Sequence, residues 1–130
     1  MTTSFNFVSF GKIEIMFLEL AHTKLDVFQA AKQFVLVCYK ETKSFPQEER
    51  FAMTSQVRRA TFSVHLNVAE GCSRKSEKER KRYYEIARGS IVEVDAALDI
   101  AVSLDYTSKE KLAELGSLMI RCFQMISKLI

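Results

Sequence analysis

Apolar and polar residues follow their clearest pattern along residues 54–71, TSQVRRATFSVHLNVAEG. At 3.6 residues per turn, this stretch forms two apolar strips with a narrow polar line between them. The strips are Val57, Ala60, Val64 and Val68, and Phe62, Leu66 and Ala69; the polar line is Gln56, Arg59, Ser63, Asn67 and Glu70. We therefore expect a helix covered on most of its circumference, whose polar groups need partners in the fold or across a subunit contact. Thr54 is its expected N-cap, and Gly71 suits the left-handed residue that ends a helix.

The next predicted helix starts at a capping box formed by Ser76 and Glu79. It should extend to about Leu104, where Asp105-Tyr106 provides the turn. Its predicted core seam has small residues in the middle, which allow close helix approach. The seam residues are Tyr83, Ala87, Ser90, Val94, Ala97, Ala101 and Leu104.

The first and last helices show the same kind of periodicity. The first follows Thr23, extends through Lys43 and ends before Phe45-Pro46, because the residue before a proline resists the helical conformation. Thr107 and Glu110 repeat the capping box before the last helix. The apolar lines are Val27, Ala30, Phe34 and Val37 with Phe28, Ala31, Val35 and Cys38 in the first helix, and Leu112, Leu115, Met119, Cys122, Ile126 and Leu129 in the last.

Four amphipathic helices with short connections predict an all-α fold, an antiparallel up-down-up-down four-helix bundle over residues 24–130. Residues 1–23 form a separate N-terminal extension. Its Gly11-Lys12 is compatible with a hairpin turn, and Ile15, Leu18 and Glu19 are equally compatible with the start of a helix. An isolated hairpin is marginally stable, so either form needs docking on the bundle or on a neighbouring chain.

Composition narrows the class of protein more than its activity. With 130 residues, 48% hydrophobic and 27% charged, the chain is expected to be one soluble domain. Four Gly and one Pro supply too little turn chemistry for a many-stranded fold. Neither a membrane span nor a secretory signal is recognisable, so the cytoplasm is the expected compartment. Cys38, Cys72 and Cys122 lack metal-ligand spacing and are expected to be buried or partly buried free thiols.

Positive charge gathers at the start of the third predicted helix, although the whole chain carries only +3. Residues 73–88 hold seven basic and three acidic side chains, a net charge of +4. Basic residues at a helix start oppose the helix dipole, which favours phosphate binding over a purely stabilising role. The alternative is a solvated face with pairs such as Glu77 and Lys81. Tyr83 is expected in the core. The candidate nucleic-acid-binding residues are Arg74, Lys75, Lys78, Arg80, Lys81, Arg82 and Arg88, with Tyr84 for stacking on a base.

Two motifs carry a resemblance to a known family. They are Gln56-Val57-Arg58-Arg59-Ala60, Ser63 and Asn67-Val68-Ala69-Glu70-Gly71, followed by Ala87-Arg88-Gly89-Ser90 with Glu93. Together with Phe45-Pro46-x-x-Glu49, they resemble the four-helix-bundle proteins encoded in intervening sequences of 23S ribosomal RNA. The resemblance covers about residues 25–130 and implies a bundle that assembles into a ring, with a pentamer as the expected size. The accessory proteins of diversity-generating retroelements are similar, and they associate with reverse transcriptase and nucleic acid. No catalytic activity comes with the resemblance.

Several motif residues are polar and form a candidate structural network or subunit interface. Glu70 lies at the negative end of a helix dipole and needs a cation, for which Arg58, Arg59 or Arg82 is the expected source. The whole candidate set is Gln56, Arg58, Arg59, Ser63, Asn67, Glu70, Gly71, Gly89, Ser90 and Glu93.

Within this set, Glu93 is expected to pair with Arg58 or Arg59. Asn67 and Ser90 are expected to bridge the second and third helices. Gly89 in mid-helix costs about 1 kcal/mol relative to alanine, which predicts a close approach of another backbone.

The chemistry of an enzyme is not recognisable in the sequence. No Gly-rich phosphate loop, HExxH or nucleophile elbow occurs, and His22 and His65 have no second ligand at metal spacing. We expect no metal, cofactor or enzymatic activity. The preferred function is a ring-forming bundle that binds RNA or another nucleic acid through residues 74–88, with a protein partner as a further expectation. The alternatives are a protein-interaction scaffold and, more weakly, an enzyme whose site forms between subunits.

Overall fold

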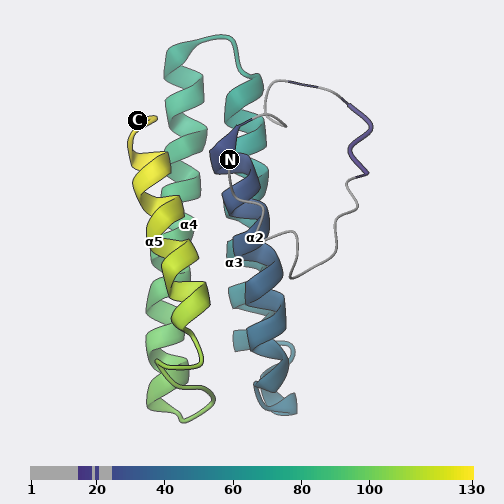
Figure 1. The fold of residues 1–130 in the computed structure, drawn as a ribbon, viewed down its shortest axis with the longest axis vertical. Coiled ribbons are helices and arrows are strands. Elements are labelled where there is room, and N and C mark those ends of the chain that lie inside the picture. Colours follow the sequence, from purple (N-terminus) through teal and green to yellow (C-terminus); the bar gives the residue numbers. More distant parts are fainter. Residues whose placement is uncertain (1–14, 19, 21–24) are drawn as a thin grey trace.

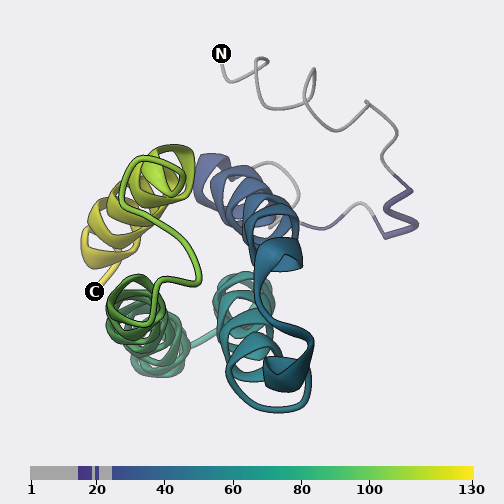
Figure 2. The ribbon, with the colours of Figure 1, turned by 90° about the horizontal axis from the view of Figure 1, so that it is seen from below.

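The computed structural model describes residues 15–18, 20 and 25–130. These residues form four α-helices and no strand: α2 (Asp26–Glu41), α3 (Met53–Ser73), α4 (Glu77–Ser103) and α5 (Ala113–Ser127). Two short 3-10 helices, η2 (Thr42–Ser44) and η3 (Gln47–Glu49), connect α2 to α3. The helices run alternately up and down, with α2 beside α3 and α5, and α4 completing the square (Figure 1, Figure 2).

The predicted antiparallel four-helix bundle is confirmed. The predicted hairpin or helix over residues 1–23 lies mostly outside the described residues. Residues 15–18 and 20 belong to no helix or strand.

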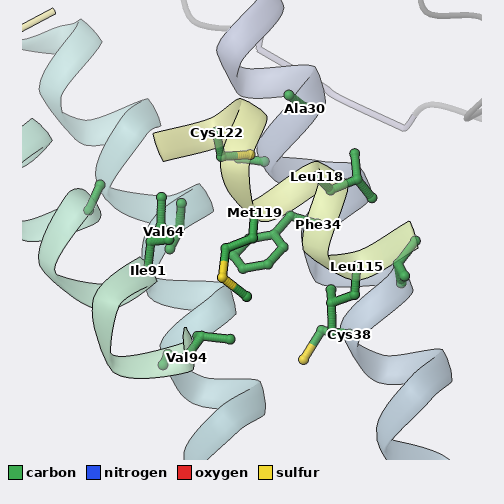
Figure 3. Packing of buried hydrophobic residues seen from close by; sticks show 14 of the residues in the cluster. Ala30, Phe34, Cys38, Val64, Ile91, Val94, Leu115, Leu118, Met119 and Cys122 are labelled. Carbon is green, nitrogen blue, oxygen red and sulfur yellow. The ribbon is translucent and has the colours of Figure 1, made fainter. Parts of the chain in front are cut away.

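Apolar side chains from all four helices meet in one core. Figure 3 shows Phe34, Val64, Ile91 and Met119, one from each helix, pointing into the shared interior. Burying a side chain of this kind contributes about 1.5–3 kcal/mol. These residues come from the apolar lines that the periodicity predicts, apart from Ile91.

The three cysteines are free, as predicted. Cys38 and Cys122 are fully buried, and burial raises their thiol pKa values to about 11 and about 12. Cys72 is half-buried, and its pKa is also raised by burial. Protonated thiols of this kind behave as small apolar side chains.

The buried face of α4 is rotated relative to the predicted seam. It consists of Tyr84, Ala87, Ile91, Val94, Leu98 and Ala101. The prediction that Tyr83, Ser90 and Leu104 belong to the core is wrong, since the first two are half-buried and Leu104 is exposed. The helix turns larger apolar side chains inward instead, because they remove more apolar area from water.

The helix ends confirm some predicted caps and correct others. Ser76 caps α4, and its Oγ accepts a hydrogen bond from the backbone N–H of Glu79 at 3.1 Å. The predicted cap at Thr107 is wrong, because α5 begins only at Ala113, after Leu112, which makes no side-chain cap hydrogen bond. In the turn before α5, the Oγ of Ser108 accepts from the N–H of Lys111 at 3.2 Å. Thr54 is also not an N-cap, since α3 begins one residue earlier and Thr54 is buried within it.

Glu49 joins two connections at the lower end of the bundle. Its Oε1 accepts from the N–H of Met53 at 3.2 Å, at the start of α3. Its Oε2 accepts from the hydroxyl of Tyr106 at 2.8 Å, and this hydrogen bond raises the pKa of Tyr106. The Tyr106 ring also lies 5.9 Å from the ring of Phe45. Asp105 adopts the left-handed conformation, with φ of 63°, and confirms the predicted turn after α4.

Gln33 of α2 is a polar exception in the core. Its side chain is 2% exposed, and neither its amide oxygen nor its amide nitrogen has a hydrogen-bond partner among the described residues. A buried amide without a partner costs about 1–3 kcal/mol. Gln33 therefore lowers the stability of the bundle.

Replacing Gln33 with leucine is expected to raise the free energy of unfolding by about 1–2 kcal/mol, because the unpaired amide is removed while the volume is kept. Urea unfolding followed by circular dichroism measures this, with an unchanged slope against urea. Gln47→Leu, at an exposed position, is the control and should change the value by less than about 0.5 kcal/mol. A less stable Gln33→Leu protein would contradict the prediction.

Candidate nucleic-acid interface

The α3–α4 end of the bundle closes around Gly71. A Cβ atom placed on Gly71 would lie 2.8 Å from Cε1 of Tyr84 and 3.1 Å from Cβ of Tyr83. These distances leave no room for a side chain, so the glycine lets the start of α4 pack directly on α3. The prediction that Gly71 is a left-handed cap is wrong, because it lies inside the last turn of α3.

Tyr83 and Tyr84 have the reverse of their predicted positions. Tyr84 is 6% exposed and belongs to the core, and its burial raises its pKa. The geometry therefore leaves Tyr84 unable to stack on a base. Tyr83 is half-buried, with the guanidinium carbons of Arg74 and Arg82 at 4.9 and 5.8 Å from its ring centroid.

Arg74 is bound within the chain. Its guanidinium pairs with the carboxylate of Glu70, one turn earlier, and donates to the hydroxyl of Tyr83 at 3.1 Å. Glu70 thus has the arginine partner expected at a helix C-terminus. The predicted partners Arg58, Arg59 and Arg82 are wrong, because Arg74, the loop residue just beyond α3, pairs with Glu70 instead.

Two further arginines of the basic segment also hold the fold. Arg80 donates from Nη1 to the carbonyl oxygens of Arg74 at 3.2 Å and Lys75 at 2.7 Å, which fixes the α3–α4 loop. Arg88 donates to the hydroxyl of Ser127 at 3.3 Å, which links α4 to the end of α5. Arg88 and Ser127 are 39 positions apart in the sequence, so local spacing could not predict their contact.

The remaining basic side chains point to solvent. Lys75, Lys78 and Arg82 are exposed and form no ion pair with the described residues. Lys81 pairs with Glu77 at 3.3 Å, as the periodicity predicts, but an exposed pair of this kind stabilises a helix only slightly. We call Lys75, Lys78, Lys81 and Arg82 the basic end of the bundle.

Sequence reasoning missed one contributor near this end. Lys128 is exposed and directly follows Ser127, the hydroxyl of which accepts from Arg88. Lys128 thereby adds a positive charge just beyond α5 to those on α4.

The second half of α4 has the opposite charge. Residues 89–108 contain no Lys or Arg, whereas Glu93, Asp95, Asp99 and Asp105 are all exposed. Along α4, positive charge is therefore confined to the half where this helix meets the end of α3, and phosphates would be repelled from the other half of α4.

Ser63 is the centre of the polar contact between α3 and α4. Its hydroxyl lies 3.0 Å from the hydroxyl of Ser90, and Asn67 donates to its carbonyl oxygen at 2.8 Å and to its Oγ at 3.0 Å. The predicted bridge by Ser90 is present in the geometry, but it runs to Ser63, and Asn67 supports it from the same helix.

Glu93 is bound by an amide in place of an arginine. Its carboxylate accepts from the Nε2 of Gln56, and Arg59 in turn donates to the Oε1 of Gln56 at 3.3 Å. The predicted pairing of Glu93 with Arg58 or Arg59 is therefore wrong. Gly89 beside it is exposed, with no atom of another part of the chain within 4 Å of an added Cβ, so the predicted close backbone approach does not occur within one chain.

Arg58 fastens α2 to α3. Its Nε donates to the hydroxyl of Thr42 at 2.8 Å and its Nη2 to the carbonyl oxygen of Tyr39 at 3.2 Å, while its guanidinium lies 4.7 Å from the Tyr39 ring centroid. These contacts assign Arg58 a structural role at the end of α2.

The second apolar strip of α3 stays uncovered in the single chain. Phe62 and Leu66 are exposed on the outer side of the helix. The expectation of a helix covered on most of its circumference is therefore not met by this chain alone, because its own helices pack on only one side of α3.

No described helix is long and apolar enough to cross a membrane. Within the part of the chain that the structure describes, no three His, Cys, Asp or Glu side chains are placed to hold a metal ion. His22 lies outside that part, and His65 stacks on the ring of Phe28 at 4.2 Å.

Fold and charge together define a small helical bundle with one basic end. A model of the 23S rRNA-intervening sequence protein family matches residues 23–128, and the chain belongs to this family. Its fold is similar to that of a protein of unknown function from the S23 ribosomal protein family of Bacteroides thetaiotaomicron VPI-5482, with a TM-score of 0.71 and 18% identity. The match covers 80% of this chain and 97% of that one, and at this identity it shows the fold alone. No curated protein matches the chain.

Replacing Gly71 with alanine is expected to lower the free energy of unfolding by about 1–3 kcal/mol, because the added methyl group collides with Tyr84. Urea unfolding measures the loss. The control is the same substitution in a Tyr84→Leu background, where the colliding ring is absent and the loss should shrink by at least about 0.5 kcal/mol. Equal losses in both backgrounds would contradict the contact.

Proposed function

We propose that this protein is a non-enzymatic homo-oligomer, a ring in its assembled form, which binds RNA through its basic end. The observation that carries the proposal is the outward position of Lys75, Lys78, Lys81 and Arg82 at one end of a bundle whose opposite end is acidic along α4. Lysine and arginine side chains of this kind bind phosphates and release counterions from nucleic acid.

The family description makes RNA the first ligand to test. It refers to the intervening sequences of 23S rRNA. Single-chain geometry favours contacts to the phosphate backbone over base readout, because Tyr84 is buried and Tyr83 already stacks with two arginines. Binding is therefore expected to depend on RNA structure and salt more than on base sequence.

The proposal of a ring is supported by the outer side of the α3–α4 pair. Phe62 and Leu66 of α3 and Ile86 of α4 are large apolar side chains that the chain itself leaves exposed. Apolar residues gathered in this way are typical of surfaces that bind another protein. We assign them to the contact between copies, in line with the pentamer that the resemblance implies.

RNA binding should be lost when the exposed charges of the basic end are neutralised. The triple variant Lys75→Gln, Lys78→Gln, Arg82→Gln avoids Arg74, Arg80 and Arg88, whose contacts hold the fold. In anisotropy titrations with a labelled structured RNA, the slope of log affinity against log salt should fall by about 2–3 for three lost phosphate contacts.

The matched control changes the net charge equally at the opposite end of the bundle. It is Lys43→Gln, Lys109→Gln, Lys111→Gln, at three exposed positions, and it should bind RNA like the unchanged protein. Equal weakening by both variants would contradict a localised site. Tight binding of duplex DNA with no binding of RNA would contradict RNA as the ligand and identify DNA in its place. An intact assembly without nucleic-acid binding at low salt would favour a protein-interaction scaffold.

The assembly should dissociate when charge enters the outer side of α3. Light scattering of the unchanged protein is expected to give about five times the 14.9 kDa chain mass, and Phe62→Glu with Leu66→Glu should give single chains of unchanged helix content. The control is Phe51→Glu with Leu129→Glu, two exposed apolar residues at opposite ends of the bundle. An unchanged mass for the Phe62 and Leu66 variant would contradict this interface.

A further inference from the structure

An apolar groove lies between α4 and α5, away from the basic end and from the outer side of α3. Two adjoining hollows of about 330 and 630 Å³ share Asp95, Met119 and Ile120 and so form one channel, which we call the α4–α5 groove. Val92 on one wall is 56% exposed, and Ile120 on the other is 61% exposed. A groove of this size and polarity is suited to a peptide segment with apolar side chains.

The N-terminal extension supplies such a segment. Ile15, Met16, Phe17 and Leu18 are four consecutive large apolar residues that the structure leaves exposed, with Phe17 at 90%. Burying each of them would contribute about 1.5–3 kcal/mol. The first 20 residues contain only three charged side chains, those of Lys12, Glu14 and Glu19.

The extension is an addition to the bundle that the family shares. The family match begins at residue 23, and the related Bacteroides structure is covered almost completely by 80% of this chain. The family's bundle therefore lies outside this segment, and the exposed side chains of residues 15–18 are available for another partner.

Within one chain, residues 15–18 and the groove cannot cover each other as they lie. Both views place residues 15–18 outside α2, on the side of the bundle opposite to the pair α4 and α5 (Figure 1, Figure 2). A neighbouring copy can present its groove to this segment. Nucleic acid is a poor occupant, because Asp95 and Asp99 line the groove and would repel phosphates.

We propose that residues 15–18 of one copy dock in the α4–α5 groove of a neighbouring copy and tie adjacent subunits together. The inference rests on the proposed function only in requiring an assembly. Burial of four apolar side chains on one partner and of Val92 and Ile120 on the other supplies the binding energy. The contact is separate from the outer side of α3 and from the basic end.

Tryptophan fluorescence tests the docking directly, because the chain contains no tryptophan. In the full-length protein, Phe17→Trp should emit at shorter wavelength than the same chain unfolded in urea, since the indole lies in the groove. Adding Val92→Asp and Ile120→Asp should return the emission to the solvent-exposed wavelength. Adding Phe51→Asp and Leu129→Asp instead, outside the groove, should leave it unchanged. Emission at the solvent-exposed wavelength in Phe17→Trp alone would overturn the proposal.

Disulfide cross-linking then distinguishes docking between copies from docking within one chain. The full-length variant Phe17→Cys, Ile120→Cys carries Cys72→Ser, while the buried Cys38 and Cys122 stay in place. Mild oxidation should give a ladder of dimers and larger species on a non-reducing gel. The control Phe17→Cys, Phe51→Cys, with the second cysteine outside the groove, should stay monomeric. Cross-linking confined to single chains, or equal ladders for both variants, would overturn the proposal.

Light scattering on the same samples separates this inference from the proposed function. A ring-sized mass with neither shifted emission nor a ladder would overturn the docking and leave the ring intact. A monomeric mass would overturn both the ring and the docking between copies. RNA titrations of the Val92→Asp, Ile120→Asp variant should retain the salt slope of the unchanged protein, because its basic end is unaltered.

Discussion

The close contact between Gly71 and the tyrosines of α4 determines how the basic end is built. Because an added Cβ would lie 2.8 Å from the Tyr84 ring, only glycine lets α4 start directly against the last turn of α3. The short α3–α4 loop then brings Arg74 next to Glu70 and Tyr83, and it brings Arg80 to the loop carbonyls. With those groups occupied inside the fold, the neighbouring lysines are left to face solvent.

Some basic residues make contacts inside the fold and others face solvent, and this difference has a physical origin. Arginine offers several N–H donors in a fixed plane, which suits it to bridge backbone carbonyls, carboxylates and aromatic rings at once. Arg58, Arg74, Arg80 and Arg88 are all used in this way. Lysine is a flexible point charge that stays hydrated, and Lys75 and Lys78 remain exposed. A charge map based on sequence treats all of them alike, whereas the fold makes these four arginines structural and leaves Arg82 and the lysines accessible.

Periodicity in the sequence was sufficient to predict the four helices, their direction and most of the core. It failed where two neighbouring registers were both apolar, as at Tyr83 and Tyr84. The register of Tyr84 turns inward because it also carries the large side chains of Ile91 and Leu98. It also failed for pairs that depend on loop geometry, such as Glu70 with Arg74 and Arg88 with Ser127. The exposure of Phe62 and Leu66 could not be predicted from one chain, since the pattern of a covered helix does not say which molecule covers it.

The charge difference along α4 makes the two ends of this helix electrostatically different and so gives the subunit a direction. Basic side chains follow the start of this helix, and only acidic ones occur over residues 89–108. Rotational symmetry about a single axis repeats one orientation of the subunit, so no copy in a closed ring is turned upside down. Such a ring would carry the basic halves of its α4 helices at one height along the axis and the acidic halves at another. A polyanion would then meet a molecule with a distinguishable front and back.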